Sequence, residues 1–224
     1  MKLTLLCNAG FSVEAADATL MVDLPNDSSA PFYELPEPIW NQILNREAPY
    51  DNVCGFIFTH VHPDHYHNHR VKDYQSRWPE IPIFSPQSTQ LKGKGKIGPF
   101  MIQYRKFEHA PIPDAPPHVV FLIEVEGKTI YFAGDASLDR SRHMEMIEKR
   151  RIDAAIWNSM YLSRSDTREM MKTCAEKNLI CHMPQKDEPG ADTYWKKLEK
   201  NLERYGTALE NVEVLGEYPT EIII

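Results

Sequence analysis

The sequence predicts an α/β fold in which two β-sheets lie face to face and helices cover their outer surfaces. The first part of the chain contains short apolar runs separated by polar turns, which is typical of an antiparallel meander. Further along, apolar runs alternate with helical patterns, as expected when helices pack on the outside of a sheet. A chain of 224 residues, of which 42% are hydrophobic, can build both sheets within one domain, residues 1–224.

The first half of the chain begins with strands and then introduces helices. The predicted elements are, in order, strands at 2–7, 11–15 and 18–24, a helix at 36–47, a strand at 54–60 and a helix from about 64 to 78. The helix at 36–47 is predicted because Trp40, Ile43 and Leu44 recur at helical intervals. The run 54–60 is continuously apolar, which is typical of a buried strand, and it leads directly into a cluster of histidines.

The second half of the chain repeats this alternation. Strands are predicted at 81–84, 100–109, 119–125, 129–135, 154–158, 179–183, 212–216 and 220–224, and helices at 138–150, 167–177 and 191–205. Between these elements, the segment 91–98 contains Lys92, Lys94 and Lys96 among glycines and is interpreted as a flexible basic loop. A solvated surface loop is favoured for it over a role in substrate binding.

Composition excludes several classes of protein. The formal net charge of −7 argues against a protein built mainly to bind nucleic acid or an anionic membrane surface. No apolar run approaches the roughly 20 residues of a membrane span, and the run from Leu3 to Cys7 is too short for a secretory signal. The expected location is therefore the cytoplasm. The widely spaced cysteines are predicted to be buried thiols rather than disulfides: Cys7, Cys54, Cys174 and Cys181.

Histidine is concentrated in one place, because five of the nine histidines lie within residues 60–69. His60 and His62 are two residues apart after a predicted strand, so their rings should point to the same side. Pro63 favours an extended backbone at His62 and can open the helix whose first turn would carry Asp64 and His65. Imidazole and carboxylate are the ligand types that zinc, iron and manganese prefer. The pattern therefore predicts a metal site.

Three further ligand-type residues follow predicted strands, at the position where active sites of α/β folds gather. His109 ends the strand at 100–109, Asp135 ends the strand at 129–135, and His182 lies near the end of the strand at 179–183. Gly134 would allow the backbone to approach the site closely. His118 is an alternative to His109, which is preferred because it ends a strand directly.

Other polar residues near the site receive weaker interpretations. Asn158 and Tyr161 follow the strand at 154–158 and could line a substrate pocket, although ordinary packing and turn formation explain them equally well. His67 and His69 lack the spacing of the other clustered histidines and are expected to be exposed helix residues.

Taken together, these motifs resemble the metallo-β-lactamase fold superfamily of metal-dependent hydrolases, and the resemblance implies an αββα four-layer sandwich. The matching motifs are Asp23 after TLMV, the cluster His60/His62/Asp64/His65, His109, Asp135 in FAGD, and His182. The resemblance implies two divalent metal ions, with zinc preferred and manganese or iron as alternatives. It assigns His60, His62 and His109 to the first ion and Asp64, His65 and His182 to the second. Asp135 would bridge the two ions, and Asp23 would orient a ligand histidine.

Within this superfamily the chain resembles small bacterial hydrolases related to L-ascorbate-6-phosphate lactonase. It departs from the glyoxalase II and ribonuclease Z branches, which usually carry glycine shortly after the cluster, where this chain has Tyr66-His67-Asn68. It also has Ala136-Ser137 after Asp135, where several characterised branches have Thr-Gly.

The resemblance implies hydrolysis by water activated between the two metal ions, with Asp64 and Asp135 orienting it. With two divalent ions bound, the site is net positive, so a small anionic ester, lactone or phosphodiester is the expected substrate. Arg105 and the 91–98 segment could add positive charge if that segment covers the mouth of the site. Two alternatives remain: a nuclease or RNA-processing hydrolase, and a metal-binding regulatory protein without catalytic activity.

Overall fold

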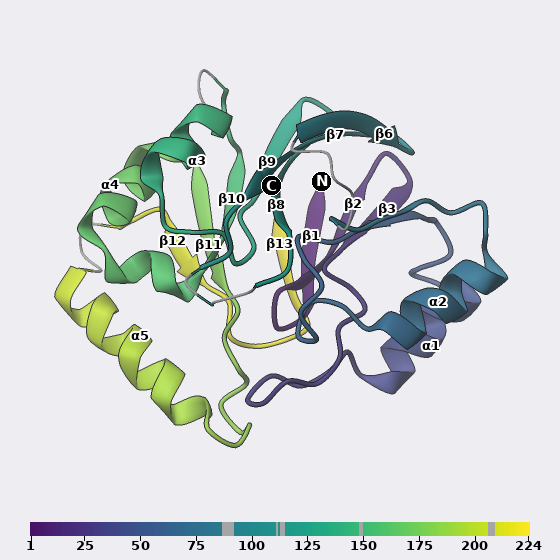
Figure 1. The fold of residues 1–224 in the computed structure, drawn as a ribbon, viewed down its shortest axis with the longest axis horizontal. Coiled ribbons are helices and arrows are strands. Elements are labelled where there is room, and N and C mark those ends of the chain that lie inside the picture. Colours follow the sequence, from purple (N-terminus) through teal and green to yellow (C-terminus); the bar gives the residue numbers. More distant parts are fainter. Residues whose placement is uncertain (87–91, 111, 113–114, 148–149, 206–208) are drawn as a thin grey trace.

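The computed structural model describes residues 1–86, 92–110, 112, 115–147, 150–205 and 209–224. Its strands form two sheets that face each other, and helices lie on both outer surfaces (Figure 1). The predicted αββα four-layer sandwich is therefore confirmed, and the two termini enter neighbouring strands of the first sheet.

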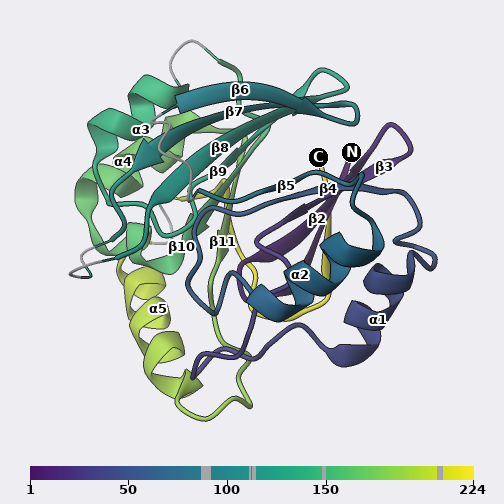
Figure 2. The same cartoon turned by 45° about the vertical axis from the view of Figure 1, so that its right-hand side comes forward.

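The first sheet combines an antiparallel meander with parallel strands. Its spatial order is β13 (Thr220–Ile223), β1 (Lys2–Cys7), β2 (Gly10–Ala15), β3 (Ala18–Val22), β4 (Val53–Ile57) and β5 (Ile83–Phe84). Strands β1, β2 and β3 pair antiparallel, whereas β3, β4 and β5 run parallel to one another. Its outer surface is covered by α1 (Glu37–Asn45) and α2 (Asn68–Arg77), as Figure 2 shows.

The second sheet is antiparallel at one side and parallel at the other. Its spatial order is β12 (Val212–Val214), β11 (Lys177–Cys181), β10 (Ala154–Asn158), β9 (Lys128–Phe132), β8 (His118–Val125), β7 (Phe100–Phe107) and β6 (Lys92–Ile97). Its outer surface carries α3 (Arg140–Ile147), the 3₁₀ helix η1 (Ser159–Ser163), α4 (Ser165–Cys174) and α5 (Ala191–Tyr205). Because β7, β9, β10 and β11 all run in the same direction, their C-terminal ends meet at one edge of the sheet.

Side chains alternate between the central core and the two outer layers. On β8, Phe121 and Ile123 are fully buried between the sheets, whereas Val120 and Leu122 are fully buried beneath the outer helices. A strand that is covered on both faces must be apolar at successive positions, since its side chains alternate in direction. This requirement explains the continuous apolar runs in the sequence.

The start of α2 differs from the prediction, because the helix begins at Asn68 and leaves Asp64 and His65 in a preceding turn. Distant backbone and side-chain groups hold this turn. The Asn8 amide donates to the Asp64 carbonyl at 2.9 Å, and the Asp27 backbone N–H donates to the Pro63 carbonyl at 2.7 Å. These carbonyls are therefore engaged outside the helix, which places both ligand candidates on the turn.

The basic segment also differs from the prediction, because Lys92–Ile97 forms a strand rather than a flexible loop, while Leu91 lies outside the described residues. Strand β6 pairs antiparallel with β7 along its whole length, from Lys92 opposite Arg105 to Ile97 opposite Phe100. This pairing supplies backbone hydrogen bonds that the lysine–glycine sequence does not predict. The tertiary context therefore outweighs the low β-strand propensity of the segment.

Other element boundaries shift by a few residues. The predicted helix at 167–177 is α4, which begins at Ser165, and the predicted strand at 179–183 is β11, which begins at Lys177. The predicted helix at 138–150 is α3, and its predicted residues 148–149 lie outside the described residues. Strand β8 begins at His118, so this histidine belongs to a strand rather than to the preceding loop.

Two further expectations concern membranes and thiols. In the described part of the chain, every helix falls short of the length and apolarity that crossing a bilayer requires. All four cysteines are free, and three of them are buried; Cys54 is only partly buried. Burial raises the pKa of the Cys54 thiol to about 11, so that thiol is protonated at neutral pH.

Candidate metal centre

The candidate ligands come from loops that follow strands. His60, His62, Asp64 and His65 follow β4, and the other three candidates, His109, Asp135 and His182, follow β7, β9 and β11. The first candidate ligand of each loop lies one to three residues after the strand ends. The loops converge, because their ligand atoms lie close together. Strand ends from both sheets therefore bring the segment 60–65 close to His109, Asp135 and His182, which lie far from it in the sequence.

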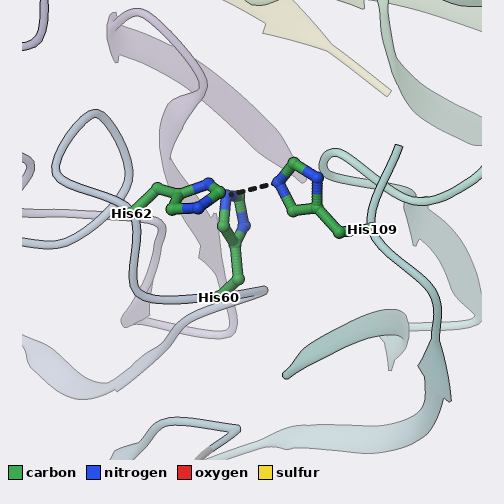
Figure 3. Close-up of side chains that lie close together, drawn as sticks. All are labelled: His60, His62 and His109. Carbon is green, nitrogen blue, oxygen red and sulfur yellow. Dashed lines mark hydrogen bonds between the residues drawn. The ribbon is translucent and has the colours of Figure 1, made fainter. Parts of the chain in front are cut away.

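His60, His62 and His109 form the first group, and their rings point toward a common centre (Figure 3). The Nε2 atoms of His60 and His109 are 3.3 Å apart. Two nitrogens bound to one tetrahedral zinc ion are separated by about 3.3 Å, given Zn–N bonds of about 2.0–2.1 Å. His109 donates its Nδ1–H to the Ala110 carbonyl at 2.9 Å, which leaves Nε2 as the free acceptor.

A hydrogen-bond relay through Thr59 orients His60. The Thr59 hydroxyl donates to Asp23 Oδ2 at 2.7 Å, so its oxygen accepts from His60 Nδ1–H at 3.0 Å. The Thr59 backbone N–H also donates to Asp23 Oδ1 at 2.6 Å. The relay fixes the ring so that His60 Nε2 faces the centre.

Asp64, His65 and His182 form the second group. His65 donates its Nδ1–H to Asp23 Oδ2 at 2.9 Å, which is the carboxylate–imidazole contact expected of Asp23. His182 Nε2 lies 3.1 Å from Asp64 Oδ2. Asn8, which the sequence reasoning missed, joins the two ligand loops: its carbonyl accepts from the His182 N–H and its amide donates to the Asp64 carbonyl.

Asp135 lies between the two groups. Its Oδ2 atom is 3.4 Å from His182 Nε2, 3.6 Å from His65 Nε2 and 3.8 Å from His109 Nε2. Its other oxygen, Oδ1, accepts a hydrogen bond of 2.6 Å from the Asn158 side-chain amide. One carboxylate oxygen is thus anchored, and the other faces imidazoles of both groups.

Backbone conformation at the site is unusual. Asp23 and His182 have φ angles of 52° and 61°, and non-glycine residues in this left-handed region are uncommon and concentrate at functional sites. Gly134 has φ 54°, and a Cβ atom there would lie 2.8 Å from both His118 Nε2 and the Thr59 side chain. The close approach predicted for Gly134 is therefore present.

His118 occupies a different position from His109. It is buried, and its Nε2 atom accepts a hydrogen bond of 3.0 Å from the Asp135 backbone N–H. Among the described residues, the group formed with His60 and His62 contains His109 rather than His118. His118 instead supports the loop that carries Asp135.

Four of the candidate histidine ligands have shifted pKa values: those of His60 and His62 are lowered, and those of His65 and His182 are raised. Burial lowers the pKa of His60 well below its ordinary value, and the neighbouring imidazoles add to the effect; burial also lowers the pKa of His62. Burial alone would lower the pKa of His182 as well, but Asp135 and Asp64 raise it to about 9. Despite burial, His182 and His65 keep the pKa of Asp135 well below its usual range.

These observations fit divalent metal ions. Imidazole nitrogens and carboxylate oxygens are the donors that zinc, iron and manganese accept. His65 Nε2 is completely buried and has no hydrogen-bond partner among the described residues, which is costly unless the nitrogen binds something. The carboxylates that raise the pKa values of His65 and His182 create a potential that equally favours a bound cation.

A pocket of about 620 Å³ opens onto the second group. Asp64, Asp135, Asn158 and His182 are among the residues that line it. Its wall is largely apolar and includes Phe32, Met160, Tyr194 and Leu198. The site is thus open to a small molecule.

Tyr161 lies elsewhere, which corrects its interpretation as a residue that could line the pocket. Its side chain is fully buried, and its hydroxyl donates to the Ala136 carbonyl at 3.0 Å. The same hydroxyl lies 2.8 Å from His143 Nε2, and the Tyr131 hydroxyl lies 2.5 Å from His143 Nδ1. Sequence reasoning missed His143, whose helical spacing to Met146 and Ile147 was the available signal that it belongs to a buried face.

The remaining clustered histidines lie apart from the centre. His69 is exposed, as expected, and His67 caps α2 by accepting from the Arg70 backbone N–H. His67 also lies near Asp27 and Glu34, but Glu34 pairs with the Arg70 guanidinium at 3.3 Å. His67 and Glu34 thus each already contact Arg70, and Asp27 Oδ1 accepts a hydrogen bond of 2.8 Å from the Ser28 backbone N–H.

Comparison with solved structures identifies the fold. The chain is similar over 99% of its length, with a TM-score of 0.67 and 16% identity, to 98% of the metallo-β-lactamase fold protein YhfI from Bacillus subtilis. It is also similar over its whole length to 99% of a possible metal-dependent hydrolase from Veillonella parvula (TM-score 0.68, 16% identity). Its whole length is likewise similar to 99% of the chain of the isothiocyanate hydrolase from Delia radicum gut bacteria (TM-score 0.69, 14% identity).

These similarities show that the chain has the metallo-β-lactamase fold. No protein-family model matches the sequence, and no curated protein is significantly similar to it in sequence. At identities of 14–16%, the neighbours establish the fold alone.

Proposed function

We propose that this protein is a hydrolase that uses two divalent metal ions. His60, His62 and His109 would hold one ion, Asp64, His65 and His182 the other, and Asp135 would bridge them. The observation that carries the proposal is the position of Asp135 Oδ2, which lies within 3.8 Å of imidazole nitrogens from both groups. The names of two neighbours of the same fold, both called hydrolases, support it.

Metal ions bound at these donors would polarise the scissile bond and lower the pKa of water to about 7, so that it attacks at neutral pH. The protein residues supply orientation. Asp64 and Asp135 accept hydrogen bonds from the attacking water and aim it at the carbonyl carbon or phosphorus. Asn158 holds Asp135 through Oδ1, while Asp23 holds His65 directly and His60 through Thr59.

For the substrate we propose a small anionic ester, lactone or phosphodiester, and zinc as the preferred metal. Two divalent ions contribute more positive charge than Asp64, Asp135 and one hydroxide remove, so the occupied site attracts an anion. Lys197 is among the residues that line the pocket, and its ammonium group adds to this attraction. The resemblance to L-ascorbate-6-phosphate lactonase relatives places a phosphorylated lactone among the first compounds to test.

The test is metal analysis of the purified protein, followed by a panel of lactones, phosphodiesters and thioesters on zinc-, manganese- and iron-loaded samples. We expect two metal ions per chain, loss of hydrolysis after chelation and recovery when the metal is returned. A metal-loaded protein that cleaves none of these compounds would favour the alternative of a non-catalytic metal-binding protein. If chelation changes neither activity nor thermal stability, the proposed metal centre is wrong.

A further inference from the structure

A second cleft, of about 800 Å³, adjoins the metal centre on the side of His109. It is bounded by β6, β7 and α3, which lie next to one another in Figure 2. His109 lines this cleft, whereas His62, Asp64 and His182 line the apolar pocket, and Ile112 borders both. The metal centre therefore lies at the junction of two spaces.

The two spaces differ in charge. Four cationic residues line the second cleft, against the single acidic residue Glu108: Lys92, Arg105, Lys106 and Arg142. The chain as a whole carries a net charge of −7, so such a concentration of positive charge next to the candidate metal ions is a local feature. Clefts lined by charges of one sign raise the local concentration of oppositely charged ligands.

Arg142 is held in place before any ligand arrives. Its Nη2 atom donates to the Lys106 carbonyl at 2.9 Å, and its guanidinium lies over the Phe107 ring, 4.7 Å from the centroid. Its carboxylate partner, Glu108, is 4.0 Å away with a side chain that is 86% exposed. This weak, solvated pair leaves the guanidinium able to exchange Glu108 for an anionic ligand.

The ammonium groups of Lys92 and Lys106 are not paired with carboxylates of the described residues. Arg105 pairs with Glu145 at 2.9 Å, but neither Lys92 nor Lys106 forms an ion pair with any residue that the structure describes. Both lysine side chains are exposed. Two ammonium groups and a preorganised guanidinium provide donors that suit the several oxygens and double charge of a phosphate.

We propose that this cleft binds a phosphate group that the substrate carries away from the bond that is cleaved, while the apolar pocket takes the other arm. The inference rests on the proposed function and narrows its substrate to phosphorylated esters or lactones with an apolar arm. In the reaction, the ester C–O bond breaks, the oxygen of water bonds to the carbonyl carbon, and a proton passes to the departing alkoxide. The phosphate is an anchor and leaves intact.

The test compares two esters that share an acyl group: phenyl butyrate and its analogue with a phosphate at the para position of the ring. The variant is Lys92→Glu/Lys106→Glu in the metal-loaded full-length protein. We expect it to lower kcat/KM for the phosphorylated ester at least tenfold more than for phenyl butyrate. Lys94→Glu is the matched control, because Lys94 lies on the same strand and is exposed but does not line the cleft.

A binding measurement separates this inference from the proposed function. Calorimetric titration with 4-hydroxyphenyl phosphate, which contains no ester, should show at least tenfold weaker binding to the double variant and unchanged binding to Lys94→Glu. This result supports the phosphate site even if neither ester is hydrolysed. The proposed phosphate site would be wrong if the double variant lowered kcat/KM equally for both esters and if wild type, the double variant and Lys94→Glu bound 4-hydroxyphenyl phosphate equally well. Salt-sensitive binding of a short RNA that the double variant loses while phosphate binding persists would also overturn it, since the cleft would then serve nucleic acid.

Discussion

Two fully buried histidines, His65 at the candidate metal centre and His143 beneath the outer helices, look alike by burial and differ in their hydrogen bonds. At the metal centre, His65 uses Nδ1 to contact Asp23, and its Nε2 atom has no hydrogen-bond partner among the described residues. Beneath the outer helices, His143 is equally buried, but both ring nitrogens have partners: Tyr131 at Nδ1, and Tyr161 with the Ser137 carbonyl at Nε2.

This difference separates a binding site from a structural contact. Burying a polar nitrogen costs free energy unless it is hydrogen-bonded, so a fully satisfied histidine such as His143 needs no ligand. His65 is anchored at one nitrogen, and its other nitrogen faces the candidate ligands Asp64 and Asp135, so it is arranged for a ligand that the rest of the protein does not provide. The experiments below test this distinction, beginning with the largest expected effect.

Removing a metal-centre residue should have the largest effect. We expect Asp135→Ala or His62→Ala to lower hydrolysis at least a thousandfold and to reduce metal occupancy, because each change deletes a donor. The fold should persist, since the surrounding core is unchanged. Activity, metal content and circular dichroism are the measurements. Full activity in either variant would contradict the assignment of the centre.

Altering the support of the ligands should have a smaller effect. Asp23→Asn keeps the size of the side chain, and asparagine tolerates the left-handed backbone at this position. It removes the charge that orients His65 and Thr59, so we expect metal affinity to fall by about 10- to 100-fold. Competition with a chromogenic chelator measures this affinity. An unchanged affinity would mean that the relay through Asp23 does not position the ligands.

For His143, the expected effect is on the pH dependence of folding stability rather than on metal binding. Burial lowers the pKa of His143 to about 4 in the folded state, against an ordinary value of 6.5. Below pH 6.5 the unfolded chain therefore binds a proton that the folded chain excludes, so acidification favours unfolding. This stabilisation is complete above pH 6.5 and declines toward pH 4, with a loss on the order of 2 kcal/mol by pH 5.

The variant that tests this expectation is His143→Gln, with urea unfolding of metal-free samples at pH 7 and pH 5. We expect wild type to lose about 2 kcal/mol more of its unfolding free energy than the variant over this interval, while metal affinity at pH 7 stays within a few-fold. Parallel pH dependence in the two proteins would show that His143 does not titrate as proposed. A large loss of metal affinity in His143→Gln would show that His143 also supports the candidate metal centre, so that it could not be contrasted with His65 as a purely structural histidine.

The sequence was sufficient for those parts of the site that are local or that end strands. His60, His62, Asp64 and His65 are close together in the chain, and His109, Asp135 and His182 stand out because each is a ligand-type side chain at or near the end of a predicted strand. The layered fold followed from the same runs. The starting point of α2 did not, since it depends on the contact of Asn8 with the Asp64 carbonyl.

Contacts between layers explain the other differences. Asn158 is the last residue of β10, and Tyr161 follows three residues later. The 3₁₀ helix η1 directs the Tyr161 ring toward His143 on α3, and no local sequence pattern identifies this neighbour. Likewise, the alternation of lysine and glycine in β6 offers no apolar face that would predict a strand, and the hydrogen bonds of β6 come from its pairing with β7.

Strand β6 has a further consequence for the behaviour of the protein in a crowded solution. It lies at the edge of the second sheet in the described strand order, with one side of its backbone not paired to another strand. Such an edge can accept a strand from a second molecule and begin aggregation, and exposed lysines are a common safeguard against this. Three ammonium groups on β6, at Lys92, Lys94 and Lys96, would meet their like-charged counterparts if two such edges came together. The lysines that suggested a loop therefore make this edge a poor template for self-association.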